Sequence, residues 1–153
     1  MLQSGIFSNT LDWLQRDDPA QLPTALQLAT RGYDVWLSSG RGRQFSDTHT
    51  TYSIADPLTR DQYWNYSFED VGLTDVEAFV DKIIEERGGA NCDKVTLVPH
   101  GTSMSEDLVA AARVPGLATK VNQITSLAPC LDANTAEFVL AESEVPTMEV
   151  LYQ

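Results

Sequence analysis

Apolar and polar positions change their spacing several times along this chain, and each change marks an expected element. Asp18 and Pro19 supply an N-cap and a first helical residue. The helix they predict ends at Gly32 and carries its apolar face on Leu22, Ala25, Leu26 and Ala29. A short apolar strand over 33–37 follows, and the polar and aromatic residues 43–68 indicate a long surface loop.

A second helix has the clearest pattern in the sequence. Thr74 and Glu77 have capping-box spacing, and Gly88 and Gly89 end the segment. The apolar residues between them recur with helical periodicity: Val76, Phe79, Val80, Ile83 and Ile84. The opposite face is charged, so this helix is expected to lie at the surface of a core.

The remainder of the chain continues the alternation. We expect strands over 94–98, 123–127 and 145–152, and helices over 105–113 and 135–142. Strands that alternate with helices in this way favour a parallel sheet with helices on its faces. The predicted fold class is therefore α/β.

Composition narrows the functional classes. The 153 residues are 42% hydrophobic, which suits a single globular domain over 1–153. Ten basic residues against 22 acidic ones give a net charge of −12, and this argues against binding to nucleic acid. No apolar run approaches the roughly 20 residues of a membrane-spanning helix.

The cysteines, the first residues and a possible glycosylation site do not decide the cellular compartment. Cys92 and Cys130 are too few for a zinc site; two free thiols are a common intracellular inventory, and one disulfide between them is also compatible with the sequence. No signal peptide is visible in the first residues. Residues 65–67 (Asn-Tyr-Ser) form a glycosylation sequon, although such triplets often arise by chance. We expect no cofactor and no metal site.

The junction between the 94–98 strand and the following helix is where an α/β enzyme would place its chemistry. In hydrolases this junction is the nucleophile elbow, G-x-S-x-G, in which a strained serine precedes an oxyanion-stabilising backbone N–H. This chain has VPHGTSMS at 98–105.

Five segments resemble the acid lipase family of gastric and lysosomal lipases, which cleave triglycerides and cholesteryl esters. GYDVWLSSGRGRQFSDTH at 32–49 resembles GYDVWLGNSRGNxxSxxH, and YWNYSFEDVGLTDVEAFVDKI at 63–83 resembles FWxFSxDEMxxYDLPAxIxxI. LQSG at 2–5, followed by Trp13, resembles LQHG. VPHGTS at 98–103 is similar to VGHSQG, and ITSLAPC at 124–130 follows at the expected distance. The resemblance implies an α/β-hydrolase core.

The departures from the family motif fall on the catalytic apparatus. An ungapped match places Gly101 where the resemblance implies the nucleophilic serine, with His100 before it and Thr102 after it. Pro99 and Ser103 replace the two elbow glycines. In the oxyanion region, Ser4 precedes Gly5 where the family has histidine. Glycine has no side chain to form an acyl-enzyme, so this register predicts a degenerate elbow.

A second register is open. Residues 101–105 read G-x-S-x-S, which would make Ser103 the fallback nucleophile, although Ser103 and Ser105 also suit the start of a helix. A triad in this fold takes its acid and its histidine downstream of the serine. The only histidines, His49 and His100, both precede residue 105.

The match also suggests a partial hydrolase core. If 145–153 is the strand before the family's catalytic acid, then the lid and the outer strands are missing, and other protein subunits would cover the open sheet. We therefore expect a lipase-like pseudoenzyme with a structural or interaction role. The alternatives are an ester hydrolase completed by residues outside this chain and a module that binds an acyl chain. The family is secreted or lysosomal, which indicates a compartment without establishing one.

Overall fold

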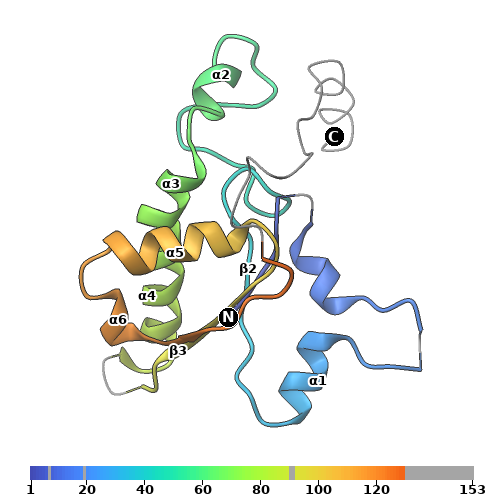
Figure 1. The fold of residues 1–153 in the computed structure, drawn as a ribbon. Helices are drawn as coiled ribbons and strands as arrows, with labels where there is room; N and C mark the ends of the chain where they lie inside the picture. Colours follow the sequence, from blue (N-terminus) through green and yellow to red (C-terminus); the bar gives the residue numbers. More distant parts are fainter. Residues whose placement is uncertain (7, 19, 90–91, 130–153) are drawn as a thin grey trace.

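A parallel four-stranded sheet lies at the centre of the computed structural model, which describes residues 1–6, 8–18, 20–89 and 92–129. The strands are β1 (Leu2–Gln3), β2 (Leu37–Ser38), β3 (Val95–Pro99) and β4 (Val121–Ile124). Their order is β2-β1-β3-β4, and each neighbouring pair is parallel. Figure 1 shows helices on both sides of these strands, which confirms the α/β class.

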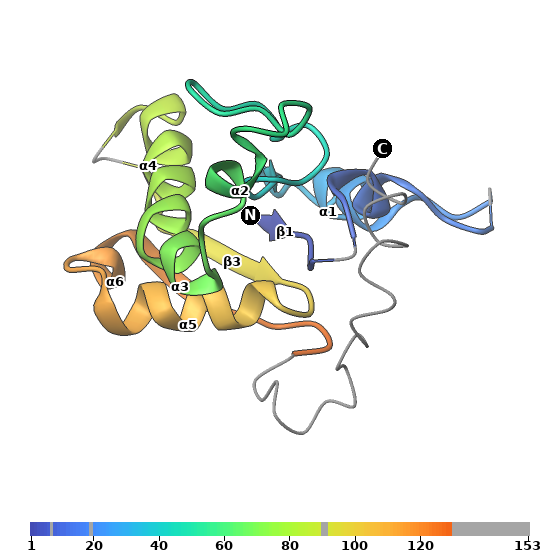
Figure 2. The same cartoon turned by 90° about the horizontal axis from the view of Figure 1, so that it is seen from above.

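Helices cover the two faces of the sheet unequally. One side carries α3 (Phe68–Asp70), the π-helical turn η2 (Val71–Asp75), α4 (Val76–Glu86), α5 (Ser103–Arg113) and α6 (Leu117–Lys120). The other carries the 3-10 helix η1 (Thr10–Leu14) and α1 (Thr24–Thr30). In Figure 2 the strands lie between these two groups. The short α2 (Arg60–Tyr63) lies within the expected loop region.

Alternating residues of the strands pack into two apolar clusters, one on each face of the sheet. The larger joins Val95 and Leu97 of β3 to Val76, Val80 and Ile83 of α4, and continues to Ala110 and Leu117. The smaller joins Leu2 to Trp13 and Ala25, with Val98 packed against it. Successive strand residues point to opposite faces, so β3 contributes to both clusters. The apolar stripe predicted for α4 is confirmed.

Several predicted boundaries were wrong. The helix after Asp18 begins at Thr24, because Asp18 closes a turn by accepting from the N–H groups of Ala20 and Gln21. Pro23 is its N-cap. The strand expected over 33–37 is shorter, since only Leu37 and Ser38 pair with β1.

The start of the second helical segment was also misplaced. Ser67 is its N-cap, and Ser67 and Asp70 form the capping box, so the helical segment begins at Phe68 rather than near Thr74. Between α3 and α4 the chain passes through η2, where Gly72 lies against α5. A Cβ at Gly72 would come within 2.6 Å of the Glu106 carbonyl oxygen, which accounts for glycine at this position.

Two later elements begin two residues earlier than predicted. Helix α5 begins at Ser103 and β4 begins at Val121. Beyond β4, Leu127 forms an isolated parallel bridge with His100. The helix and strand expected over 135–142 and 145–152 lie outside the described residues, as does Cys130. None of the helices in the described part of the chain is long and apolar enough to cross a membrane.

Candidate functional site: the β3–α5 turn

The turn between β3 and α5 has the backbone geometry of a strand-to-helix elbow. Strand β3 ends at Pro99, and α5 begins only four residues later at Ser103. Gly101 makes the reversal with φ +61°, in the left-handed region that glycine adopts without steric cost. The turn is held from two sides, because His100 N–H donates to the Gln3 carbonyl and Gly101 N–H donates to the Leu127 carbonyl.

The space above Gly101 is open. A Cβ built there would meet only the Cα of Gly5, at 3.9 Å, which is an ordinary van der Waals distance. A small side chain at this position would therefore meet no obstruction. Gly101 itself offers no hydroxyl or thiol that could attack an ester carbonyl.

Ser103 lies inside the protein at the first position of α5. It is fully buried, and its Oγ donates a 2.6 Å hydrogen bond to the carbonyl oxygen of Ser4. This bond joins the start of α5 to the end of β1. The hydroxyl proton is thus used in a structural contact rather than directed to solvent.

The segment after β1 packs tightly against the elbow. A Cβ at Gly5 would come within 2.9 Å of the His100 carbonyl oxygen, so this close approach requires glycine. The Ser4 carbonyl accepts a second hydrogen bond, from Nη1 of Arg43. Ser4 Oγ is buried and has no hydrogen-bond partner in the described part of the chain.

Thr102 connects the two segments through its side chain. The N–H of Ile6 donates a 2.9 Å hydrogen bond to Oγ1 of Thr102. In a hydrolase elbow, the oxyanion is stabilised by the N–H that follows the nucleophile together with an N–H from the loop after a neighbouring strand. Thr102 and Ile6 occupy these two positions here, and the Thr102 hydroxyl accepts from the Ile6 N–H.

Two buried acidic residues of α5 lie beside this junction. Glu106 pairs with Arg43 at 2.8 Å, and Asp107 Oδ1 accepts a 2.8 Å hydrogen bond from Nε2 of Gln3. Burial raises the pKa of Glu106, although Arg43 opposes the shift. Burial raises the pKa of Asp107 to about 7, and the bond from Gln3 offsets only part of that effect.

The two histidines contact different aromatic residues. His100 is exposed at the elbow, and its ring lies perpendicular to the Trp13 ring, with 6.3 Å between the ring centroids. His49 stacks on Tyr52, and its Nδ1 accepts from the N–H groups of Thr51 and Tyr52. Within the described residues, neither imidazole is hydrogen-bonded to a carboxylate, the partner that orients a catalytic base.

A separate groove of about 640 Å³ runs between the 41–66 segment and α4. Its walls combine aromatic rings with polar groups: Arg41, Thr48, His49, Tyr52, Gln62, Tyr63, Asn65, Tyr66, Asp75 and Phe79 among them. The Tyr66 hydroxyl donates to the Arg41 carbonyl, and burial raises the pKa of Tyr66 to about 12. No group of three or more metal-ligating side chains occurs among the described residues.

Comparison with known proteins identifies the relatives of this chain. It is 30% identical over 132 residues to lysosomal acid lipase/cholesteryl ester hydrolase of Rattus norvegicus, covering 86% of this chain and 31% of that protein. A probable lipase of Schizosaccharomyces pombe is 31% identical over 126 residues, covering 82% and 26%. Gastric triacylglycerol lipase of Rattus norvegicus is 29% identical over 150 residues, covering 95% and 35%. No protein-family model matches the sequence.

The chain belongs to the acid lipase-like family. This confirms the resemblance inferred from the sequence motifs. The chain spans about a third of the length of these curated relatives.

Several residues that shape the elbow of this acid lipase-like chain were not predicted from the sequence. Ile6 directly follows the LQSG motif, so its position beside the motif was available as a signal. Glu106 and Asp107 lie three and four residues after Ser103, which places all three on one helix face. Arg43 gave no comparable signal, because its partners Ser4 and Glu106 are distant in sequence.

Proposed function

We propose that this chain is a lipase-like pseudoenzyme that acts as a structural or interaction subunit of a protein assembly. The observation that carries the proposal is Gly101, which has the left-handed φ of the elbow and no nucleophilic side chain. An acyl-enzyme needs an oxygen or sulfur nucleophile at this turn. The elbow has kept its shape without the group that gives it catalytic power.

The Ile6–Thr102 hydrogen bond supports the same conclusion independently. An oxyanion hole acts through donors that are directed at the reacting oxygen before the reaction begins. Here the Ile6 N–H is directed at the Thr102 hydroxyl, 2.9 Å away. Productive stabilisation of an oxyanion by Ile6 would require this contact to break first.

The alternative of an ester hydrolase requires Ser103 as the nucleophile. Ser103 is fully buried and bonded to the Ser4 carbonyl, so its attack on a substrate would require α5 to lose its first residue. It would also require a base and an acid from residues outside the described part of the chain. The burial of Ser103 therefore favours the non-catalytic proposal.

The interaction role rests on exposed strands and side chains. Strands β2 and β4 each pair with one neighbour in the described part of the chain, and Asn122 and Gln123 of β4 are exposed. Leu22, which lies before α1, is 50% exposed, and Leu26, which lies within α1, is 44% exposed. An outer strand offers backbone groups that another protein can pair with or cover.

Ester hydrolysis by the purified chain tests the catalytic question. We expect no turnover of short-chain p-nitrophenyl esters above the buffer rate, with an active acid lipase as the positive control. Hydrolysis that disappears in Ser103→Ala would overturn the proposal, provided that this variant keeps the wild-type circular dichroism.

The interaction role is tested on the natively purified chain by intact-mass measurement and light scattering. Stoichiometric co-purifying protein chains are expected. A monomer whose lipid extract contains a stoichiometric acyl compound would instead support the module that binds an acyl chain.

A further inference from the structure

Asn65 lies in a short connection between two helices. Trp64 is the C-cap of α2, and Ser67 is the N-cap of α3, so only two residues separate the helix ends. Asn65 is exposed, and its backbone N–H donates to the Gln62 carbonyl, while its side-chain amide makes no hydrogen bond with the described part of the chain. An exposed amide in a surface connection can carry a bulky modification without disturbing a core.

The residues around Asn65 have the sequence needed for such a modification. Asn65, Tyr66 and Ser67 form an acceptor sequon for N-linked glycosylation. In the folded chain, Ser67 Oγ donates to Asp70 Oδ2 at 2.8 Å and accepts from the Asp70 N–H. Ser67 therefore has a second role as a cap, which allows the two roles to be separated by substitution.

Aromatic rings flank Asn65 on both sides. Trp64 is 43% exposed, and its ring centroid lies 4.8 Å from that of Tyr63 and 6.2 Å from that of Tyr66. Asn65 also lines the polar and aromatic groove described above. A sugar ring has one apolar face and polar edges, so a surface of aromatic rings beside amide and hydroxyl groups suits it.

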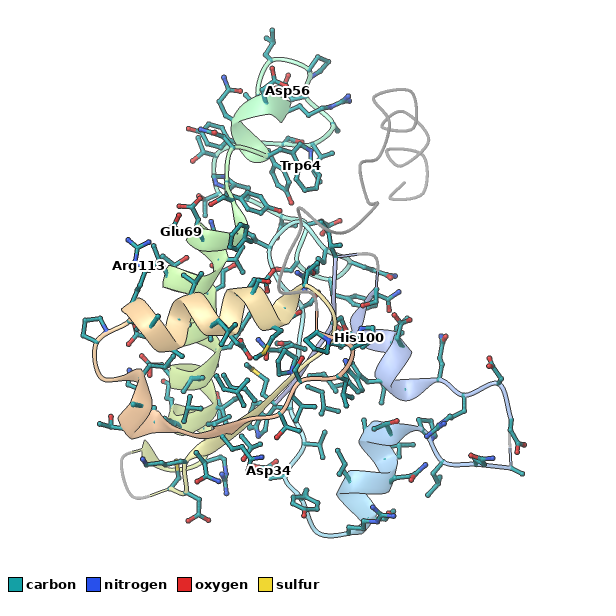
Figure 3. All side chains as sticks on the ribbon, viewed as in Figure 1. Asp34, Asp56, Trp64, Glu69, His100 and Arg113 are labelled. Carbon is teal, nitrogen blue, oxygen red and sulfur yellow. The ribbon has the colours of Figure 1, made fainter. Side chains whose placement is uncertain are left out.

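We propose that Asn65 carries an N-linked glycan whose first N-acetylglucosamine packs against Trp64. In the transfer, Asn65 Nδ2 forms a bond to the anomeric carbon of a lipid-linked oligosaccharide. The bond from that carbon to the lipid diphosphate breaks, and the amide proton leaves with the diphosphate. Figure 3 shows Trp64 beside α2, separate from His100 at the elbow. The proposal is thus independent of the catalytic question.

Expression of the full chain behind a cleavable signal peptide, in a eukaryotic secretory host, tests the modification. A C-terminal Asn-Gly-Thr tag reports entry into the endoplasmic reticulum. We expect two glycans by intact mass, of which Asn65→Gln removes one. Ser67→Thr keeps both sequon and cap and should retain the glycan, whereas Ser67→Asn keeps a capping side chain and should lose it. A glycosylated tag with an unmodified Asn65 would overturn the proposal.

The contact with Trp64 is tested separately by thermal unfolding. Trimming the glycan to a single N-acetylglucosamine should leave the Tm about 2–4 °C above that of the fully deglycosylated chain. In Trp64→Ala the difference between these two forms should disappear. An equal Tm difference in the wild type and in Trp64→Ala would overturn the packing of the sugar against Trp64, while leaving its attachment to Asn65 supported.

Discussion

The N–H of Ile6 donates to the side-chain hydroxyl of Thr102 across a distance of 2.9 Å. The two residues are 96 positions apart in sequence and come from the loops that follow two neighbouring strands, β1 and β3. In an active hydrolase with this arrangement, an N–H from each loop would be directed at the substrate oxygen. Here the N–H of one loop is paired with a hydroxyl of the other loop, so the arrangement stabilises the fold instead of facing a substrate.

Thr102→Val should therefore weaken the connection between the loops. The substitution removes the hydroxyl with little change in shape and leaves the Ile6 N–H without this acceptor. We expect a loss of about 1 kcal/mol in the free energy of unfolding. Amide exchange at Ile6, followed by NMR, should accelerate. Thr102→Ser keeps the acceptor and serves as the control, and equal exchange rates in both variants would contradict the role of the hydroxyl.

The two glycines that face each other at the elbow should respond differently to substitution. Gly101→Ser places its Cβ in open space at a left-handed φ, so we expect a cost of about 1 kcal/mol. Gly5→Ala brings its Cβ to 2.9 Å from the His100 carbonyl oxygen and should cost more than twice as much. Urea denaturation of the two variants measures the contrast. A larger loss of stability in Gly101→Ser than in Gly5→Ala would show that the space above Gly101 cannot hold a side chain.

Gly101→Ser is also expected to remain inactive toward esters. The new hydroxyl would have no histidine base among the described residues, since His49 stacks on Tyr52 and the His100 ring packs perpendicular to the Trp13 ring. The Ile6 N–H would still be directed at Thr102. Burst kinetics with an activated ester provides the measurement, and Gly101→Ala is the matched control. A burst in the serine variant alone would reveal a base that the present site does not show.

The sequence predicted the parts of this fold that depend on local pattern. The stripe of Val76, Val80 and Ile83 identified α4, because helical periodicity reflects one buried face. The start of the same helical segment was misplaced, since Thr74–Glu77 and Ser67–Asp70 have the same capping spacing and only packing distinguishes them. Continuation through η2 depends on the close approach of Gly72 to α5, which no local pattern encodes.

The candidate site was predictable only where it follows a motif. Gly101 was placed at the turn by its alignment with the family motif, and the structure gives it φ +61°. The contacts of Ser103 with Ser4, and of Arg43 with Glu106, join residues 99 and 63 positions apart. Such pairs follow from the order of the strands, which a single sequence without an alignment does not specify.

The buried Arg43–Glu106 pair should contribute strongly to stability when one partner is removed. Arg43→Met leaves a carboxyl group in the interior without its cation, and we expect a loss of about 3 kcal/mol. The double variant Arg43→Met with Glu106→Leu removes both charges and should recover most of that loss. Denaturant unfolding of the single and double variants forms the test. Lys82→Met breaks the exposed ion pairs with Glu85 and Glu86 and is the control, which should change the free energy of unfolding far less. Additive losses would contradict a coupled pair.

Asp107 should make the protein less stable as the pH rises toward neutrality. Burial is the main cause that raises its folded pKa from 3.8 to about 7, with Glu106 adding to the shift and the Met1 ammonium opposing it. Between these two values the folded state holds a proton that the unfolded state has lost. The free energy of unfolding should therefore fall by up to about 1.4 kcal/mol per pH unit and level off above pH 7.

Asp107→Asn should remove this part of the pH dependence. The amide has no proton to lose in this range, and its oxygen can still accept from Nε2 of Gln3. We expect the variant to gain stability over the wild type at pH 8 and to match it near pH 4. Urea unfolding at intervals across this range measures the difference between the two curves. The exposed Asp61→Asn is the control, and parallel curves for Asp107→Asn and wild type would show that Asp107 is already ionised in the folded protein.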